Sequence, residues 1–356
     1  MAEPKDRPPV ALPEREESRE MRLLERRAFV AAGLGLFLVL SARQAEIQGQ
    51  QRGGGAGRGE GGGGGRIEVW APMPVKPNPF VPPNKPLTKL SDLLAKHKSE
   101  QSWTEAVVRD NLFHGDYISM GPGGKTPRRF HQDNRAFWIV QDGQIRFTIE
   151  GQEPFVASKG FLVQVPKRLV YSMETVGDRP SLRFEVTMAN SNIMYPADET
   201  PTPVPGVRFE RTRVANAKGA YDEANVPFID YNLTIAGHPK PKKNQNQFVG
   251  DPHDGGYVNV GISNILRGNP ATQPPARDDD LGHFHLTGPE FWFMLEGQNE
   301  FKIGSVPIFV ANQGDIIYAP AQTWHRPRHV GTGMATRLAI VGYANSHVYG
   351  LTGGAE

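Results

Sequence analysis

Three histidines and one glutamate in the C-terminal half of this 356-residue chain have the residue types of a metal site. His283, His285 and Glu290 lie in the stretch GHFHLTGPEFWFMLEG (282–297), and His325 follows further along the chain. Neutral imidazoles with one carboxylate suit a divalent transition metal such as Mn, Fe, Co, Ni, Cu or Zn, whereas Ca and Mg prefer all-oxygen ligands. The chain has no cysteine, which excludes thiolate zinc sites, iron–sulfur clusters and disulfides.

Strand geometry explains how these side chains could meet. Successive side chains point to opposite faces of a strand, so His283 and His285 share one face. On the next predicted strand, Glu290, Trp292 and Met294 share a face. If that face points inward, Glu290 lies beside the imidazoles, and Trp292 and Met294 become candidates for lining a substrate pocket.

A further predicted strand, GDIIYAP (314–320), precedes His325. Its inner face is expected to belong to the same cavity, which makes Tyr318 another candidate pocket residue. His253, His329 and His347 are candidates for orienting a ligand or relaying a proton, with a purely structural role as the alternative for each.

The chain contains an internal repeat at a constant offset of 154 residues. Residues 136–171 align without a gap to residues 290–325, and eleven of these thirty-six positions are identical. The short alternating runs between turn residues favour antiparallel strands in a sandwich or barrel. We therefore expect two copies of one β-domain, joined through DETPTPVPG (198–206). Trp138 matches Trp292 in this alignment, so packing explains that tryptophan at least as well as substrate contact does.

The ligand spacing resembles the signature of the cupin superfamily, G-x5-H-x-H-x3–4-E-x6-G followed by G-x5-P-x-G-x2-H-x3-N. The matching elements here are His283-x-His285-x4-Glu290-x6-Gly297 and Gly314-x5-Pro320-x4-His325. Three other positions depart from the signature, namely Arg277, Gln322 and His329. The resemblance implies an all-β fold of two tandem cupin barrels (double-stranded β-helix, or jelly-roll), with one metal ion inside the second.

The first copy keeps the glycines and the proline of this signature but loses most of the ligands. Arg129, His131, Ala136 and Tyr171 stand where the second copy has its three histidines and its glutamate. The resemblance therefore implies a bicupin whose first barrel holds no metal. Arg129, His131 and Tyr171 are the candidate residues of this degenerate site. Two interpretations stay open: anion binding by Arg129 and His131, and an ion pair of Arg129 with a nearby acid.

The N-terminal region has the features of an export signal. Arg26 and Arg27 precede the apolar run from Ala28 to Leu40, which is too short to cross a bilayer comfortably. The stretch resembles a twin-arginine signal, which predicts a periplasmic or extracellular protein. A short N-terminal membrane tether that is not cleaved is the alternative.

Composition along the chain predicts the domain organisation. Residues 1–48 are the export signal region, and residues 49–86 are a Gly-rich tether and a Pro-rich arm. Residues 87–200 form the metal-free N-terminal cupin, and residues 206–350 form the metal-binding C-terminal cupin. A helix is expected near Leu87 to Lys98, because Leu90, Leu93 and Leu94 fall on one helical face.

The resemblance implies an exported mononuclear metal enzyme, and we favour a dioxygenase acting on a small organic or phenolic compound. The metal would be Mn, Fe, Ni or Cu, and Glu290 would also act as a catalytic base by family analogy. An oxalate-decarboxylase-like Mn lyase, an isomerase and a non-catalytic ligand-binding bicupin stay open, as does homo-oligomerisation. A net charge of +2 and the lack of a basic stripe give no reason to expect a nucleic-acid partner.

Overall fold

The computed structural model describes residues 67–221, 226–231, 262–269, 279–330, 335–342 and 347–351, without the side chains of 262–269, 329 and 342. These residues form antiparallel sheets together with one short helix, α2 (Leu90–Lys96), which confirms the predicted all-β class. No helix in the described ranges is long and apolar enough to span a bilayer. The predicted export signal and Gly-rich tether lie outside these ranges.

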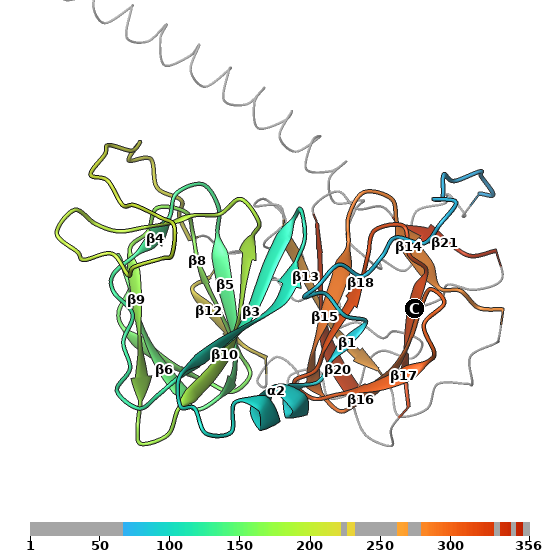
Figure 1. The fold of residues 1–356 in the computed structure, drawn as a ribbon, viewed down its shortest axis with the longest axis horizontal. Coiled ribbons are helices and arrows are strands. Elements are labelled where there is room, and N and C mark those ends of the chain that lie inside the picture. Colours follow the sequence, from blue (N-terminus) through green and yellow to red (C-terminus); the bar gives the residue numbers. More distant parts are fainter. Residues whose placement is uncertain are drawn as a thin grey trace, which may run out of the picture. The chain divides into compact units, whose positions relative to one another are not determined.

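The first barrel is built from a six-stranded sheet, a three-stranded sheet and a two-stranded sheet (Figure 1). The strand order in the largest sheet is β12-β8-β5-β10-β3-β2, and in the three-stranded sheet it is β7-β6-β9. The strands are β2 (Trp103–Arg109), β3 (Phe113–Met120), β4 (Phe130–His131), β5 (Ala136–Asp142), β6 (Gln144–Ile149), β7 (Phe155–Ser158), β8 (Phe161–Val165), β9 (Tyr171–Val176), β10 (Ser181–Met188), β11 (Ile193–Met194) and β12 (Phe228–Asp230).

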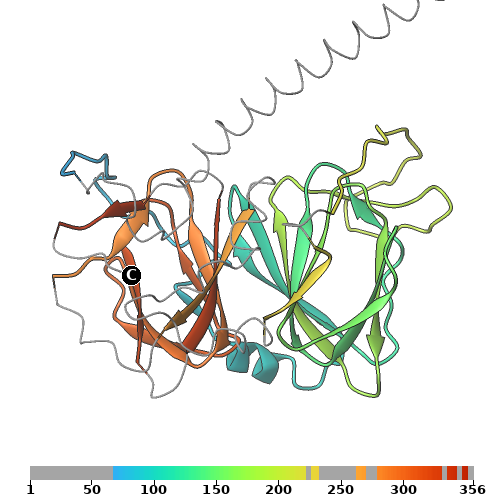
Figure 2. The same cartoon turned by 180° about the vertical axis from the view of Figure 1, so that it is seen from behind.

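The second barrel is built from two five-stranded sheets, drawn mostly in orange and red in Figure 2. Their orders are β1-β18-β15-β20-β13 and β17-β16-β19-β14-β21. The strands are β1 (Leu87–Thr88), β13 (Ile262–Asn269), β14 (His283–His285), β15 (Glu290–Glu296), β16 (Gln298–Ile303), β17 (Phe309–Asn312), β18 (Ile316–Ala319), β19 (His325–His329), β20 (Ala335–Gly342) and β21 (His347–Tyr349).

The internal repeat reappears in the strand bounds. Strands β5, β6, β7 and β10 recur as β15, β16, β17 and β20, and each bound is offset by 154 residues. The turns after β5 and β15 use Gly143 and Gly297, whose φ angles of 70° and 67° lie in the left-handed region that favours glycine. A Cβ on Gly143 would also lie 2.6 Å from the carbonyl oxygen of Pro180. The constant offset therefore reflects a turn that the backbone requires in both copies.

The six-stranded sheet of the first barrel and the sheet of the second barrel that contains β15 are each buried on both faces. One face lines its own barrel interior, as with Trp138 in the first barrel and Trp292 in the second. The other face joins a shared core in which the rings of Phe113 and Phe291 lie 5.4 Å apart. Burying each such ring stabilises the fold by about 1.5–3 kcal/mol, so the shared core couples the two barrels.

Two short strands cross the predicted domain boundaries. Strand β1, expected in the first domain, pairs with β18 of the second barrel through Leu87 and Ile317. Strand β12, expected in the second domain, pairs with β8 of the first barrel. The barrels thus exchange short edge strands across the predicted boundaries 87–200 and 206–350, because an exposed sheet edge is completed by whichever segment reaches it.

Helix α2 is shorter than the sequence predicts. It begins at Leu90 and not at Leu87, and Leu94 is 47% exposed while Leu90 and Leu93 are buried. The backbone N–H of Leu90 donates to a carboxylate oxygen of Asp315 over 3.0 Å. A side chain of the second barrel thus satisfies one of the free N–H groups at the start of this helix.

Candidate metal centre

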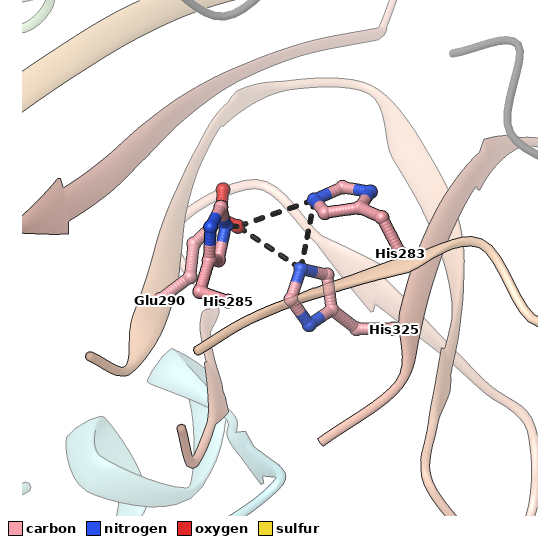
Figure 3. A group of neighbouring side chains, drawn as sticks. All are labelled: His283, His285, Glu290 and His325. Carbon is pink, nitrogen blue, oxygen red and sulfur yellow. Dashed lines mark hydrogen bonds and ion pairs between the residues drawn. The ribbon is translucent and has the colours of Figure 1, made fainter. Parts of the chain in front are cut away.

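The second barrel brings the four predicted ligands together from its two facing sheets. His283 and His285 lie on β14 and His325 lies on the neighbouring strand β19, with His283 opposite His325 in the register. Glu290 is the first residue of β15 in the other sheet. The side chains point toward one another in Figure 3, and their ligand atoms all lie within 4.8 Å of one another.

The distances between the ligand atoms are those of groups that share a common centre. One oxygen of Glu290, Oε2, lies 2.7 Å from Nε2 of His285 and 3.0 Å from Nε2 of His325. The same oxygen is 3.7 Å from Nε2 of His283, which lies 3.0 Å from Nε2 of His325. Ligands bound at about 2.1 Å to one ion, on adjacent coordination positions, are separated by about 3 Å. The donor set therefore fits a single transition-metal ion.

The protonation states in the site also suit a metal. The imidazoles are each 1% exposed and Glu290 is 5% exposed. Burial alone would raise the pKa of Glu290, but hydrogen bonds with His283, His285 and His325 outweigh it and hold this pKa well below its usual value. Burial, aided by the neighbouring His283, lowers the pKa of His325 to about 4. At neutral pH the site thus presents a carboxylate and a neutral His325, the forms that bind metal ions.

The backbone fixes the orientation of one ligand. Nδ1 of His325 lies 2.9 Å from the carbonyl oxygen of Thr323, which can only accept, so Nδ1 carries the proton. In the neutral ring, Nε2 of His325 then carries the lone pair that a metal ion would bind, and it donates to Glu290 only when the ring is protonated. Such a hydrogen bond to the outer nitrogen is the usual means of fixing the tautomer and ring orientation of a ligating histidine.

Two of the three candidate pocket residues face the interior of the second barrel. Trp292 and Met294 are fully buried there, and the ring of Trp292 meets the ring of His325 edge-on at 5.1 Å. Tyr318 does not line this interior, and that prediction is wrong. It lies on the opposite face of β18 from Ile317 and packs in the core shared by the barrels.

His347 lies against the metal site, although it falls outside the repeat. Strand β21 pairs with β14 so that His347 is opposite His285, and its ring is 4.6 Å from that of His285 and 4.5 Å from that of His283. The ring of Tyr349, which sequence reasoning missed, is 5.7 Å from that of His283. His253 lies outside the described residues, and only the backbone of His329 is described, opposite Asn299.

The first barrel places different chemistry at the matching positions. Nε2 of His131 lies 3.1 Å from the hydroxyl of Tyr171, and the guanidinium of Arg129 lies 5.5 Å from the centre of the Tyr171 ring. Arg129 also lies 3.7 Å from a carboxylate oxygen of Glu185, on β10. Glu185 was missed by sequence reasoning, although the offset of 154 aligns it with Ala339 of the second copy. That comparison would have shown an acid in one copy and not in the other.

Comparison with known proteins agrees with this architecture. The family model described as "Cupin domain" matches residues 116–187 and 271–341, so the chain carries two cupin domains. A structure of salicylate 1,2-dioxygenase from Pseudaminobacter salicylatoxidans matches with a TM-score of 0.55 and 13% identity, covering 79% of this chain and 92% of that one. A mutant of that enzyme in complex with gentisate matches with a TM-score of 0.54 and 12% identity, covering 75% and 85%. No curated protein matches the chain in sequence.

Proposed function

We propose that this protein is a mononuclear metal-dependent oxidoreductase, namely a dioxygenase that acts on a small phenolic or other organic acid. The observation that carries the proposal is the buried group of three imidazoles and one carboxylate at His283, His285, Glu290 and His325. These four residues would hold a divalent transition metal, which would supply Lewis acidity toward a substrate oxygen and redox chemistry toward dioxygen.

The chain itself would contribute charge, orientation and the exclusion of water. Glu290 stays ionised because of its histidine neighbours, and it offsets part of the charge of a divalent ion. Thr323 holds the ring of His325 in the ligating orientation. Trp292 packs against His325, and Met294 extends the same apolar interior along β15, which keeps water from the reacting groups. We also assign Glu290 the role of a base toward an acidic proton of the substrate.

An aromatic acid fits this wall better than a small polar substrate does. The interior of the second barrel is lined by aromatic and aliphatic side chains, including Trp292 beside His325, Phe301 against Trp292, and Met294. The solved dioxygenase with the same fold is described with gentisate, a compound of this class. We therefore propose phenolic carboxylates as the substrates to test first.

A decarboxylase of the oxalate type is less well supported. It needs a protonatable carboxyl over the metal in addition to Glu290. The other buried carboxylate of the second barrel within the described ranges, Asp315, accepts the backbone N–H groups of Leu90 and Asn312. It is therefore committed to structural hydrogen bonds.

We further propose that the protein is exported with its metal already bound. The support is the pair Arg26–Arg27 before the apolar run that ends at Leu40. A route that carries folded proteins would let the cell choose the ion before export. Replacing both arginines with lysine should leave the protein inside the cell, as measured by fractionation, and unchanged export of this variant would contradict the proposal.

The enzymatic proposal is tested with protein purified from its native host. Elemental analysis should find one transition-metal ion per chain, and an oxygen electrode should record uptake of one dioxygen per salicylate or gentisate consumed. The His283→Ala variant should lose both the ion and the oxygen uptake. Release of carbon dioxide from oxalate without net oxygen consumption would support the lyase. Metal-loaded protein that turns over neither the phenolic acids nor oxalate would support a binding module.

A further inference from the structure

The interior of the first barrel contains two arginines that face a single carboxylate. Arg183 and Glu185 alternate along β10 with Phe184 and Val186, which pack in the core shared by the barrels. Arg183 and Glu185 therefore point into their own barrel, where Arg129 approaches from the segment that pairs with Tyr171. Sequence reasoning missed Arg183 as well as Glu185.

Among the residues that the structure describes, the charges in this interior do not balance. Glu185 lies 3.7 Å from the guanidinium of Arg129, and its carboxylate also accepts the indole N–H of Trp138. Asp116, opposite Glu185 in the sheet, is already paired with Arg109 at 2.5 Å. One carboxylate thus faces the two guanidinium groups of Arg129 and Arg183, which leaves one net positive charge.

The two neighbouring titratable groups do not alter this balance. Burial lowers the pKa of His131 to about 4 and raises the pKa of Tyr171 to about 12. His131 and Tyr171 are therefore both neutral near pH 7.

Arg183 also has hydrogen-bonding capacity that its surroundings leave unused. It is 2% exposed, and its Nε and Nη1 atoms have no hydrogen-bond partner within the described part of the chain. Nε of Arg129 is likewise buried and has no hydrogen-bond partner among the described residues. A buried guanidinium left without acceptors costs substantial free energy, so these N–H groups must meet water or an anion.

We infer that the first barrel binds one small carboxylate, held by the free N–H groups of Arg183 and by the charge of Arg129. A guanidinium offers two parallel N–H donors that match the two oxygens of a carboxylate. A single negative charge balances the interior, whereas a doubly charged phosphate or sulfate would overshoot it. The walls are apolar, with Trp138 and Val140 among them, which suits a carboxylate that has a short hydrocarbon or aromatic body. The first barrel is thus an anion site in which Arg129 matches the metal ligand His283 of the second barrel, whereas Arg183 matches Arg337.

The inference is tested by calorimetric titration of the full chain with sodium acetate and sodium benzoate, at constant ionic strength set with chloride. Binding should be saturable and should survive removal of metal by a chelator, which separates it from any binding at the metal centre. The Arg183→Met variant should bind at least about tenfold more weakly. The matched control is Arg337→Met, because Arg337 is 1% exposed and occupies the same place in the second barrel. This control should keep the affinity of the wild type.

The Glu185→Gln variant separates loss of the site from damage to the fold. It raises the net interior charge, so it should bind acetate more tightly than the wild type, a change that misfolding does not produce. Acetate should also raise the Tm of the wild-type protein relative to chloride, which needs no variant. The inference is overturned if no binding survives the chelator, if Arg183→Met binds like the wild type, or if Arg337→Met weakens binding equally. Water alone would then solvate Arg183.

Discussion

At the scale of single residues, the metal centre depends on one carboxylate that faces three imidazoles. Nε2 of His283 and Nε2 of His325 lie 3.0 Å apart, so without an ion one of the two nitrogens must carry a proton and donate it to the other. Glu290 comes from the opposite sheet and closes the group on the remaining side. A divalent ion would take the place of that proton, because it can bind both nitrogens and neutralise the buried carboxylate.

The Glu290→Gln variant tests this dependence. Glutamine keeps the size of the side chain but removes its charge, so metal affinity should fall by more than about 100-fold. The measurement is metal content after dialysis together with competition against a chelator of known affinity. Glu296→Gln is the matched control, since it lies at the exposed end of the same strand and should keep its metal. Equal metal content in the two variants would refute the assignment of Glu290.

The buried His131 predicts how stability depends on pH. Its pKa is about 4 in the folded protein against 6.5 for an ordinary histidine, so the unfolded chain binds more protons between these values. The free energy of unfolding should therefore decrease as the pH falls from 6.5 toward 4, by up to about 3 kcal/mol, and this contribution is fully present above pH 6.5. Urea denaturation should show a flatter pH dependence for His131→Gln. An identical slope in both proteins would mean that His131 does not stay neutral.

At the scale of elements, the close pairing of β14 with β19 aligns His283 and His325. Gly282 allows it, because its φ is 75° and a Cβ there would lie 2.1 Å from the carbonyl oxygen of His325. Gly282→Ala must therefore push the strands apart. We expect a loss of about 3 kcal/mol or more in the free energy of unfolding and clearly weaker metal binding.

The control for this prediction is Gly151→Ala. Gly151 has the same φ of 75°, but a Cβ added there would have no atom within 4 Å. The free energy of unfolding of this variant should fall by only about 1–2 kcal/mol, which is the cost of an L side chain at a positive φ, and the variant should keep its metal. If chemical denaturation and metal titration gave the same result for both variants, steric separation of the strands would not be the cause.

Local patterns were enough to predict much of this architecture. The offset of 154 residues located both copies, and glycine turns such as Gly143 and Gly297 marked the same hairpin in each. Alternation along a strand placed His283 and His285 on one face, and the resemblance to the cupin signature added Glu290 and His325 to the same site.

The features that the sequence did not predict depend on contacts between segments far apart in the chain. Tyr318 was assigned to the wrong face because both faces of β18 are buried, so alternation cannot tell the barrel interior from the shared core. The pairing of β1 with β18 and of β12 with β8 depends on which sheet edges lie within reach. His347 reaches the metal site through the pairing of β21 with β14, and no family spacing marks it.

At the scale of the whole described unit, the shared core predicts that the barrels unfold together. Phe291 is fully buried, and its ring lies 5.4 Å from that of Phe113 and 6.3 Å from that of Phe184, both in the first barrel. Phe291→Ala should lower the free energy of unfolding by about 3–5 kcal/mol. Because the lost contacts span both barrels, calorimetry should show a single transition shifted to lower temperature.

Two probes can follow the barrels separately in this variant. In proteins whose other four tryptophans are replaced by phenylalanine, the fluorescence of Trp138 reports on the first barrel, and metal release reports on the second. Both should change at one temperature in the wild type and at one lower temperature in Phe291→Ala. The matched control is Phe147→Ala, a buried ring inside the first barrel alone, which should also shift both probes together if unfolding is cooperative. Metal release that keeps its wild-type temperature in Phe147→Ala would show instead that each barrel is stable by itself, and that the shared core joins them without coupling their unfolding.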